Sequence, residues 1–152
     1  MTKEAFDCKI VASDISTDAL DVARLNAERH GVSKKIRFIN SDLFGNIEDR
    51  FDIIVSNPPY IALFEFETLQ KEVLREPKTA LDGGEDGLDF YRRIAGGAPD
   101  HLRSGGHIIF EIGFGQAGEV CKILQERGVF KVVGIEKDFN GIDRVVIATW
   151  IN

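Results

Sequence analysis

The tetrapeptide Asn57-Pro58-Pro59-Tyr60 contains residue types that could hold and orient a planar amino group. The side-chain carbonyl of Asn57 can accept a hydrogen bond from an NH₂ group, and the main-chain carbonyls of Asn57 and Pro58 offer further acceptors. The two prolines have no N–H and a fixed φ, and the ring of Tyr60 can cover a flat group. Because no side chain here is an obvious base, we expect catalysis by orientation, in which the held nitrogen directs its lone pair at an electrophile.

The position of the tetrapeptide favours this interpretation over a proline-rich turn that only ends a core strand. It follows the short apolar run Phe51–Ser56, which is typical of a buried parallel strand. In open α/β sheets, ligands bind at the carboxyl ends of the strands. The residue before a proline also prefers extended geometry, so Asn57 is expected to be held in a set direction at that edge.

Two aspartates follow two earlier predicted strands. Asp14 could accept hydrogen bonds from ribose hydroxyls, and Asp42 could accept the amino group of adenine while Leu43 covers the ring. Each aspartate could instead cap the helix or turn that follows it. Three successive strands that end in Asp14, Asp42 and Asn57 at one edge of a sheet favour a nucleotide site.

Strand-like and helix-like segments alternate along the chain, which predicts an α/β fold. A helix is expected from the N-cap Ser16 to Gly31, and others around Tyr91 and Val120. Gly96-Gly97 and Pro99 predict a kink or break in the helix around Tyr91. The last two strands should form an antiparallel hairpin through Asn140-Gly141. The predicted strands are Lys9–Ser13, Ile36–Ile39, Phe51–Ser56, His107–Ile112, Val129–Ile135 and Arg144–Trp150.

The composition is that of one soluble globular domain spanning residues 1–152, with 43% hydrophobic and 29% charged residues. A formal net charge of −6 disfavours binding of nucleic acid through its phosphates. Neither a signal peptide nor a membrane span is evident. Cys8 and Cys121 lack metal-ligand spacing and are expected to be reduced core residues of a cytoplasmic protein, without a metal.

The segment from about Ile61 to Gly87 is polar and aromatic, and ordered loops of this length are often functional. Phe64 and Phe66 could guard a substrate entrance, although packing in a small cluster under the loop is favoured. Trp150 is expected to pack in the core or at an edge of the sheet.

These residues resemble the S-adenosylmethionine-dependent methyltransferases and, more narrowly, the HemK/PrmC family, which methylates a glutamine side-chain nitrogen in peptide chain release factors. The resemblance covers nearly the whole chain. It is carried by Asp14-Ile15-Ser16, Ser41-Asp42-Leu43-Phe44, Ile54 to Ile61, Glu76-Pro77 with Ala80 to Tyr91, Glu111-Ile112-Gly113 with Gln116, and Lys137-Asp138 with Gly141 and Arg144.

The resemblance implies a Rossmann-like fold with a mostly parallel sheet and a C-terminal antiparallel hairpin. It implies S-adenosylmethionine as the cofactor, bound by Asp14, Asp42, Leu43 and Asn57, and a release factor as the substrate. Asn57, Pro58, Pro59 and Tyr60 would form the catalytic clamp. Glu76 could form a structural ion pair or contact the substrate. Enzymes that methylate adenine or guanine amino groups in nucleic acids share the clamp motif, and a non-catalytic remnant is a third alternative.

The sequence departs from the family at its start, where the first strand and the glycine-rich turn for the methionine end of the cofactor are not found. Residues 2–6 resemble the end of the helix that should follow that turn, so we expect an N-terminally truncated methyltransferase domain with little or no activity by itself. The missing strand would lie between the strands that end at Asp14 and Asn57. Both strands should therefore have open edges, through which the chain could self-associate.

Overall fold

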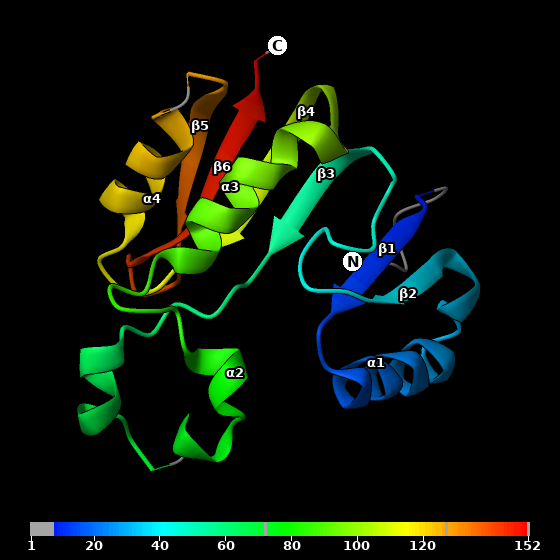
Figure 1. Cartoon of the computed structure of the whole chain (residues 1–152), viewed down its shortest axis with the longest axis horizontal. Helices are drawn as coiled ribbons and strands as arrows, with labels where there is room; N and C mark the ends of the chain where they lie inside the picture. The colour runs from blue at the N-terminus through cyan, green and yellow to red at the C-terminus, as the bar shows by residue number, and fades with distance from the viewer. Residues whose placement is uncertain (1–7, 72, 127, 152) are drawn as a thin grey trace. The chain divides into compact units, whose positions relative to one another are not determined.

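The computed structural model describes residues 8–71, 73–126 and 128–151, and the chain divides between Asp49 and Arg50 into two compact units. Among these residues, the first unit has two strands and one α-helix, and the second has four strands with three α-helices (Figure 1). The predicted α/β alternation is confirmed. The predicted resemblance of residues 2–6 to a helix end lies outside the described residues.

The first unit is a β–α–β segment whose two strands run in parallel. Its elements are β1 (Ile10–Asp14), α1 (Thr17–Arg29), the 3₁₀ turn η1 (Ser33–Lys35) and β2 (Ile36–Asn40). The register runs from Ile10 opposite Ile36 to Asp14 opposite Asn40. The carboxyl ends of both strands therefore lie at the same edge of this small sheet.

Local sequence rules account for the ends of α1. The Ser16 hydroxyl oxygen accepts a hydrogen bond from the Ala19 N–H at 3.2 Å, as predicted for an N-cap. The helix stops before Gly31, whose φ of +68° is a left-handed conformation that suits glycine. Leu20 and Ala27, seven residues apart, form the buried face of the helix.

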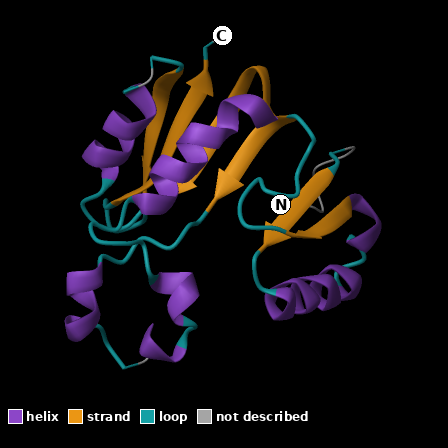
Figure 2. Ribbon diagram, in the orientation of Figure 1, coloured by secondary structure: helices purple, strands orange, loops and turns teal. Residues whose placement is uncertain are grey.

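The second unit contains a four-stranded sheet with the order β3-β4-β6-β5. β3 and β4 pair in parallel, whereas β6 runs antiparallel to both β4 and β5, so the predicted hairpin is confirmed. Helices α3 and α4 contact each other and the strands, and they lie on one face of the sheet (Figure 2). The elements are β3 (Phe51–Ser56), η2 (Leu63–Thr68), η3 (Val73–Arg75), α2 (Lys78–Leu81), α3 (Asp89–His101), β4 (Leu102–Glu111), α4 (Ala117–Gln125), β5 (Phe130–Lys137) and β6 (Asp143–Trp150).

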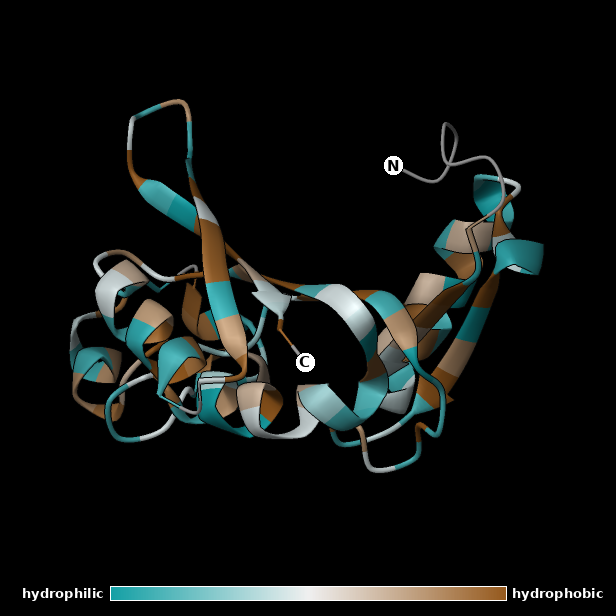
Figure 3. Ribbon diagram, turned by 90° about the horizontal axis from the view of Figure 1, so that it is seen from above, coloured by the Kyte–Doolittle hydropathy of each residue, from teal (hydrophilic) through white to brown (hydrophobic). Residues whose placement is uncertain are grey.

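The core of the second unit lies between these two helices and the sheet. Tyr91 on α3 packs edge-on against Phe110 on β4, with ring centroids 5.2 Å apart, and both side chains are fully buried. Val120 on α4 and Val146 on β6 are also fully buried. Figure 3 shows the alternation of hydrophobic and hydrophilic residues along the helices that such one-sided packing requires.

The strands that end at Asp14 and before Asn57 each pair on one side only within the described part of the chain. β1 pairs only with β2, and β3 pairs only with β4. On β3, Ile53 and Val55 keep 53% and 63% of their surface exposed. The β3 edge therefore carries exposed apolar side chains.

The sequence predicted a kink or break in the helix around Tyr91, and the break is wrong, because α3 continues through Gly96-Gly97 and Pro99 to His101. Pro99 lies in the last turn, so its missing N–H removes only one hydrogen bond near the helix end. Ala95 and Ala98 are buried. Tertiary packing therefore overrides the weak helix propensity of this segment.

Two further expectations about burial are wrong. Cys8 is exposed because it precedes the paired part of β1, and Cys121 is only half-buried. Phe64 is 75% exposed, whereas Phe66 is half-buried and has the Lys78 ammonium group over its ring. Trp150 is buried at the end of β6, as predicted. No helix among the described residues is long and apolar enough to span a membrane.

Tyr91→Phe tests the importance of the one polar group in this aromatic contact. The Tyr91 hydroxyl donates a hydrogen bond to the Glu111 carbonyl at 3.0 Å, so its loss should lower the free energy of unfolding by about 1–2 kcal/mol at neutral pH. Urea unfolding followed by Trp150 fluorescence reports on this unit. The control is Phe139→Leu, at a fully exposed side chain, which should change the free energy of unfolding by less than about 0.5 kcal/mol.

The same variant should change the alkaline stability. Burial raises the pKa of the Tyr91 phenol above its ordinary value. The native state then keeps a proton that the unfolded chain loses above about pH 10, so stability falls as the pH rises through that range. Tyr91→Phe lacks this loss, and the difference between the two proteins should shrink above about pH 10. A constant difference would contradict this account.

Candidate active site

The predicted clamp lies at the carboxyl end of β3, where the strand stops at Ser56. Asn57 is exposed, Pro58 is buried, and Pro59 and Tyr60 are half-buried. The segment thus has a solvent-facing amide at one end and a packed backbone behind it. Asn57 therefore lies at the predicted strand end, at an exposed position.

The acceptors expected to bind an amino group are available. In the described chain, no hydrogen bond uses the Asn57 side chain or the Pro58 carbonyl. The carbonyl of Tyr60, by contrast, accepts a hydrogen bond from the Gln116 side chain at 3.0 Å. Among the described residues, the Asn57 side chain and the Pro58 carbonyl are therefore still able to accept hydrogen bonds, whereas the Tyr60 carbonyl already accepts one.

The residues after Tyr60 are fixed by backbone pairing with the end of the following segment. The Ile61 N–H donates to the Leu81 carbonyl at 3.0 Å, and the Gly83 N–H donates to the Ile61 carbonyl at 2.9 Å. The Leu63 N–H donates to the Gly84 carbonyl at 3.0 Å. The long segment predicted as functional is thus closed at its base, directly beside the clamp.

In the sequence, only the family resemblance points to Gln116, whose side chain connects the clamp to two other segments. Its Nε2 also donates to the Gly87 carbonyl at 3.3 Å, and its Oε1 accepts from the Gly113 N–H at 3.0 Å. One sequence feature could have indicated its role: a glutamine next to a glycine in the loop after β4, the strand that pairs with β3. Tyr60 and Gly87 are distant from Gln116 in the sequence, whereas Gly113 is three residues away.

In the first unit, Asp14 is exposed at the end of β1. Its Oδ1 accepts the Ser16 N–H at 2.8 Å, so the predicted capping role is real. Its main-chain carbonyl accepts the Ser41 N–H at 3.0 Å, which joins the ends of β1 and β2. The second carboxylate oxygen can still accept a hydrogen bond from a ligand.

Asp42 and Leu43 lie in the turn that follows β2. Asp42 is exposed, and Leu43 is half-buried with a φ of +51°. Left-handed backbone is unfavourable for a residue with a branched side chain. The Ser41 hydroxyl closes this turn, since it donates to the Leu43 carbonyl at 2.9 Å and accepts the Asn46 N–H at 3.0 Å. The structure thus brings Asp14, Asp42 and Leu43 to one edge of the first unit.

The hairpin turn between β5 and β6 lies at the same edge of its sheet as Asn57, because β6 begins beside the end of β4. Asp138 organises this turn. The Ile142 and Asn140 N–H groups and the Arg144 guanidinium, all donating to its carboxylate, hold the pKa of Asp138 below its usual range. Glu76 is exposed, and none of the ion pairs found in the described chain includes it.

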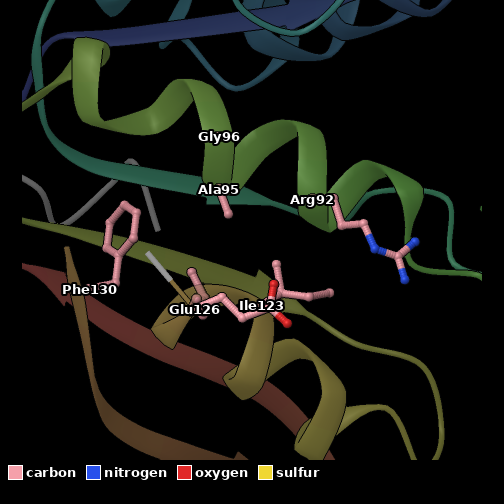
Figure 4. Close-up of a pocket in the computed structure, with 7 residues that line it drawn as sticks. Arg92, Ala95, Gly96, Ile123, Glu126 and Phe130 are labelled. Carbon is pink, nitrogen blue, oxygen red and sulfur yellow. The ribbon is translucent and has the colours of Figure 1, made fainter. Parts of the chain in front are cut away.

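A hollow of about 180 Å³ lies between α3, α4 and the start of β5 (Figure 4). Its wall includes Arg92 and Glu126, and none of the predicted site residues lines it. Arg92 is engaged with Asp86 and Asp89. No cluster of potential metal ligands occurs among the residues that the structure describes.

Comparison with known proteins gives a family match. The methyltransferase small domain family model matches residues 1–87. The chain is 45% identical over 148 residues to release factor glutamine methyltransferase of Geobacter sulfurreducens, covering 96% of this chain and 51% of that protein. It is 44% identical over 152 residues to the protein of the same name from Clostridium acetobutylicum, covering 97% and 53%. The chain therefore spans about half the length of these relatives.

Solved structures confirm the predicted Rossmann-like methyltransferase fold. A methyltransferase from Pyrococcus furiosus matches with a TM-score of 0.70 and 22% identity, covering 99% of this chain and 67% of that one. A release factor-specific protein-(glutamine-N5) methyltransferase from Alicyclobacillus acidocaldarius matches with a TM-score of 0.53 and 23% identity, covering 99% and 85%.

The left-handed conformation of Leu43 can be tested with a matched pair of variants. Leu43→Ala and Leu43→Gly both remove the side chain, but only glycine tolerates the positive φ without strain. We expect the glycine variant to be more stable than the alanine variant by about 1 kcal/mol. Urea unfolding followed by circular dichroism measures the difference. An alanine variant of equal or higher stability would contradict the left-handed turn.

Proposed function

Since the chain belongs to the methyltransferase small domain family, we propose that it acts as an S-adenosylmethionine-dependent methyltransferase domain whose acceptor is a glutamine side-chain amide in a peptide chain release factor. The observation that carries this proposal is the exposed Asn57 amide, presented at the carboxyl end of β3 by a backbone that is fixed behind it. Residues 1–152 act in this proposal as one methyltransferase domain.

The residues of the first unit fit the adenosine part of the cofactor. Asp14 offers a carboxylate oxygen at a strand end, where ribose hydroxyls can donate to it. Asp42 would accept the adenine amino group, and Leu43 would cover the ring. The cofactor would supply a methyl group on a positively charged sulfur.

The clamp would act by orientation. The Asn57 side-chain carbonyl and the Pro58 carbonyl would each accept one hydrogen of the substrate NH₂ group, and the Tyr60 ring would cover the plane of the amide. With both hydrogens held, the nitrogen lone pair is directed along one line. Good alignment of this kind can lower the activation free energy by about 7–11 kcal/mol. A rigid clamp would keep that alignment without a base.

The choice of substrate is supported by the names of the relatives and by the charge of the chain. The relatives at 40–45% identity include several named release factor glutamine methyltransferases. The net charge of −6 disfavours a phosphate-rich substrate. A methyltransferase for the amino groups of nucleic-acid bases is the alternative that the experiment must exclude.

Asp14→Asn and Asn57→Ala should separate the two parts of the proposed site. Titration with S-adenosylhomocysteine, followed by NMR, should shift amides around Asp14 and Asp42, and Asp14→Asn should weaken this binding at least about tenfold, since a hydrogen bond to a charge is lost. A peptide with a central glutamine should shift amides around Tyr60. Asn57→Ala should abolish that response and leave adenosine binding and Trp150 fluorescence unchanged.

Methyl transfer to a purified release factor is the direct assay, with labelled cofactor and mass spectrometry of the glutamine. Asn57→Ala should remove any transfer that the chain supports. A wild-type chain that binds neither the adenosine compound nor the peptide would contradict the proposal. Binding of RNA or DNA that weakens steeply with salt, together with base methylation, would favour the nucleic-acid alternative.

A further inference from the structure

We infer that Gln116 is the positioning residue for the clamp: its side chain fixes the peptide between Tyr60 and Ile61, and this limits the movement of the backbone that carries Asn57. The chemical meaning of this inference rests on the proposed function. The hydrogen bonds themselves do not depend on it, so the two can be tested apart.

The Gln116 side chain serves partners other than its own helix. Gln116 is the N-cap residue of α4, yet its side chain makes no capping hydrogen bond. It crosses instead to the Tyr60 and Gly87 carbonyls through Nε2 and to the Gly113 N–H through Oε1. The orientation of the amide is fixed by chemistry, because Nε2 faces two acceptors and Oε1 faces a donor.

The key bond holds one end of a single peptide plane. The Tyr60 carbonyl accepts from Gln116 at 3.0 Å, and the Ile61 N–H of the same plane donates to Leu81 at 3.0 Å. A peptide plane bound at both ends cannot rotate unless both hydrogen bonds break. Only Pro58 and Pro59, whose φ angles are fixed, separate Asn57 from Tyr60. The orientation of this plane therefore limits how far the backbone at Asn57 can move.

Three glycines allow the segments to approach closely enough for these bonds. A Cβ atom on Gly83 would lie 2.8 Å from the Tyr60 Cα, and one on Gly113 would lie 2.7 Å from the Gln116 Oε1. A Cβ on Gly87 would also collide with the Tyr60 carbonyl. We call Gly83, Gly87 and Gly113 the glycine socket. It surrounds Tyr60 and Gln116 and leaves little room for another conformation.

Glutamine is the residue type that this position requires. A glutamate has the same shape, but its charged carboxylate would place an oxygen against the Tyr60 and Gly87 carbonyl oxygens. A methionine has a similar length and offers no donor. The nearby Tyr91 hydroxyl cannot replace the lost donor, because it donates to the Glu111 carbonyl and lies 3.4 Å from the Gln116 Oε1.

The test compares Gln116→Glu and Gln116→Met with Gln125→Glu, a control at an exposed position on the same helix. Amide hydrogen exchange of Ile61, measured by NMR on the whole chain, reports directly on the peptide plane. At neutral pH, both Gln116 variants should lose protection at Ile61 by about tenfold or more, the effect of one hydrogen bond. The control should match the wild type.

Acid pH distinguishes a positioning role from general damage to the fold. A protonated glutamate can donate to the Tyr60 carbonyl, so the protection factor of Ile61 in Gln116→Glu should rise again as the pH falls below about 5. Gln116→Met should show no such recovery. Tyr91 keeps its proton throughout this range, because burial raises its pKa.

Unchanged protection at Ile61 in both Gln116 variants would overturn the inference. So would equal losses of protection at Ile61 and in the core of β4, since those indicate a general loss of stability. The glutamine peptide gives the separate readout for function. If the wild type binds no peptide while Ile61 responds as expected, the proposed function fails and the positioning role of Gln116 stands.

Discussion

The peptide plane between Tyr60 and Ile61 is the constraint on which the candidate active site depends. Gln116 holds its carbonyl and Leu81 accepts from its N–H. These two contacts join the end of β3 to the loop after β4 and to the base of the long segment that follows the clamp. Because the prolines before this plane have fixed φ angles, a constraint at Tyr60 also limits the movement of the backbone at Asn57.

Local rules made much of the fold predictable. The N-cap Ser16, the left-handed Gly31 and the antiparallel β5–β6 hairpin follow from residue types at short range. The placement of Asp14 and Asn57 at strand ends was predictable for the same reason, since each comes directly after an apolar run. Capping, turn chemistry and strand periodicity all act within a few residues.

Features that depend on distant contacts could not be read from the sequence. α3 continues through Pro99 because its buried alanines pack in the core, and Cys8 is exposed because the pairing of β1 begins after it. The role of Gln116 requires the carbonyls of Tyr60 and Gly87, which only the fold brings to its side chain. The left-handed Leu43 is contrary to its residue type, and the Ser41 hydroxyl that closes its turn is a tertiary detail of the same kind.

The glycine socket also affects how this part of the gene can vary. Every missense change in a glycine codon introduces a side chain, and at Gly83, Gly87 and Gly113 even a single carbon atom meets backbone or side-chain atoms at less than 3.0 Å. Even a substitution by alanine is therefore disfavoured at these three positions. The side chain of Phe114, which follows Gly113 in the chain, is exposed and is not restricted in this way. We therefore expect many amino-acid types to be tolerated at Phe114 and almost none except glycine at the neighbouring Gly113.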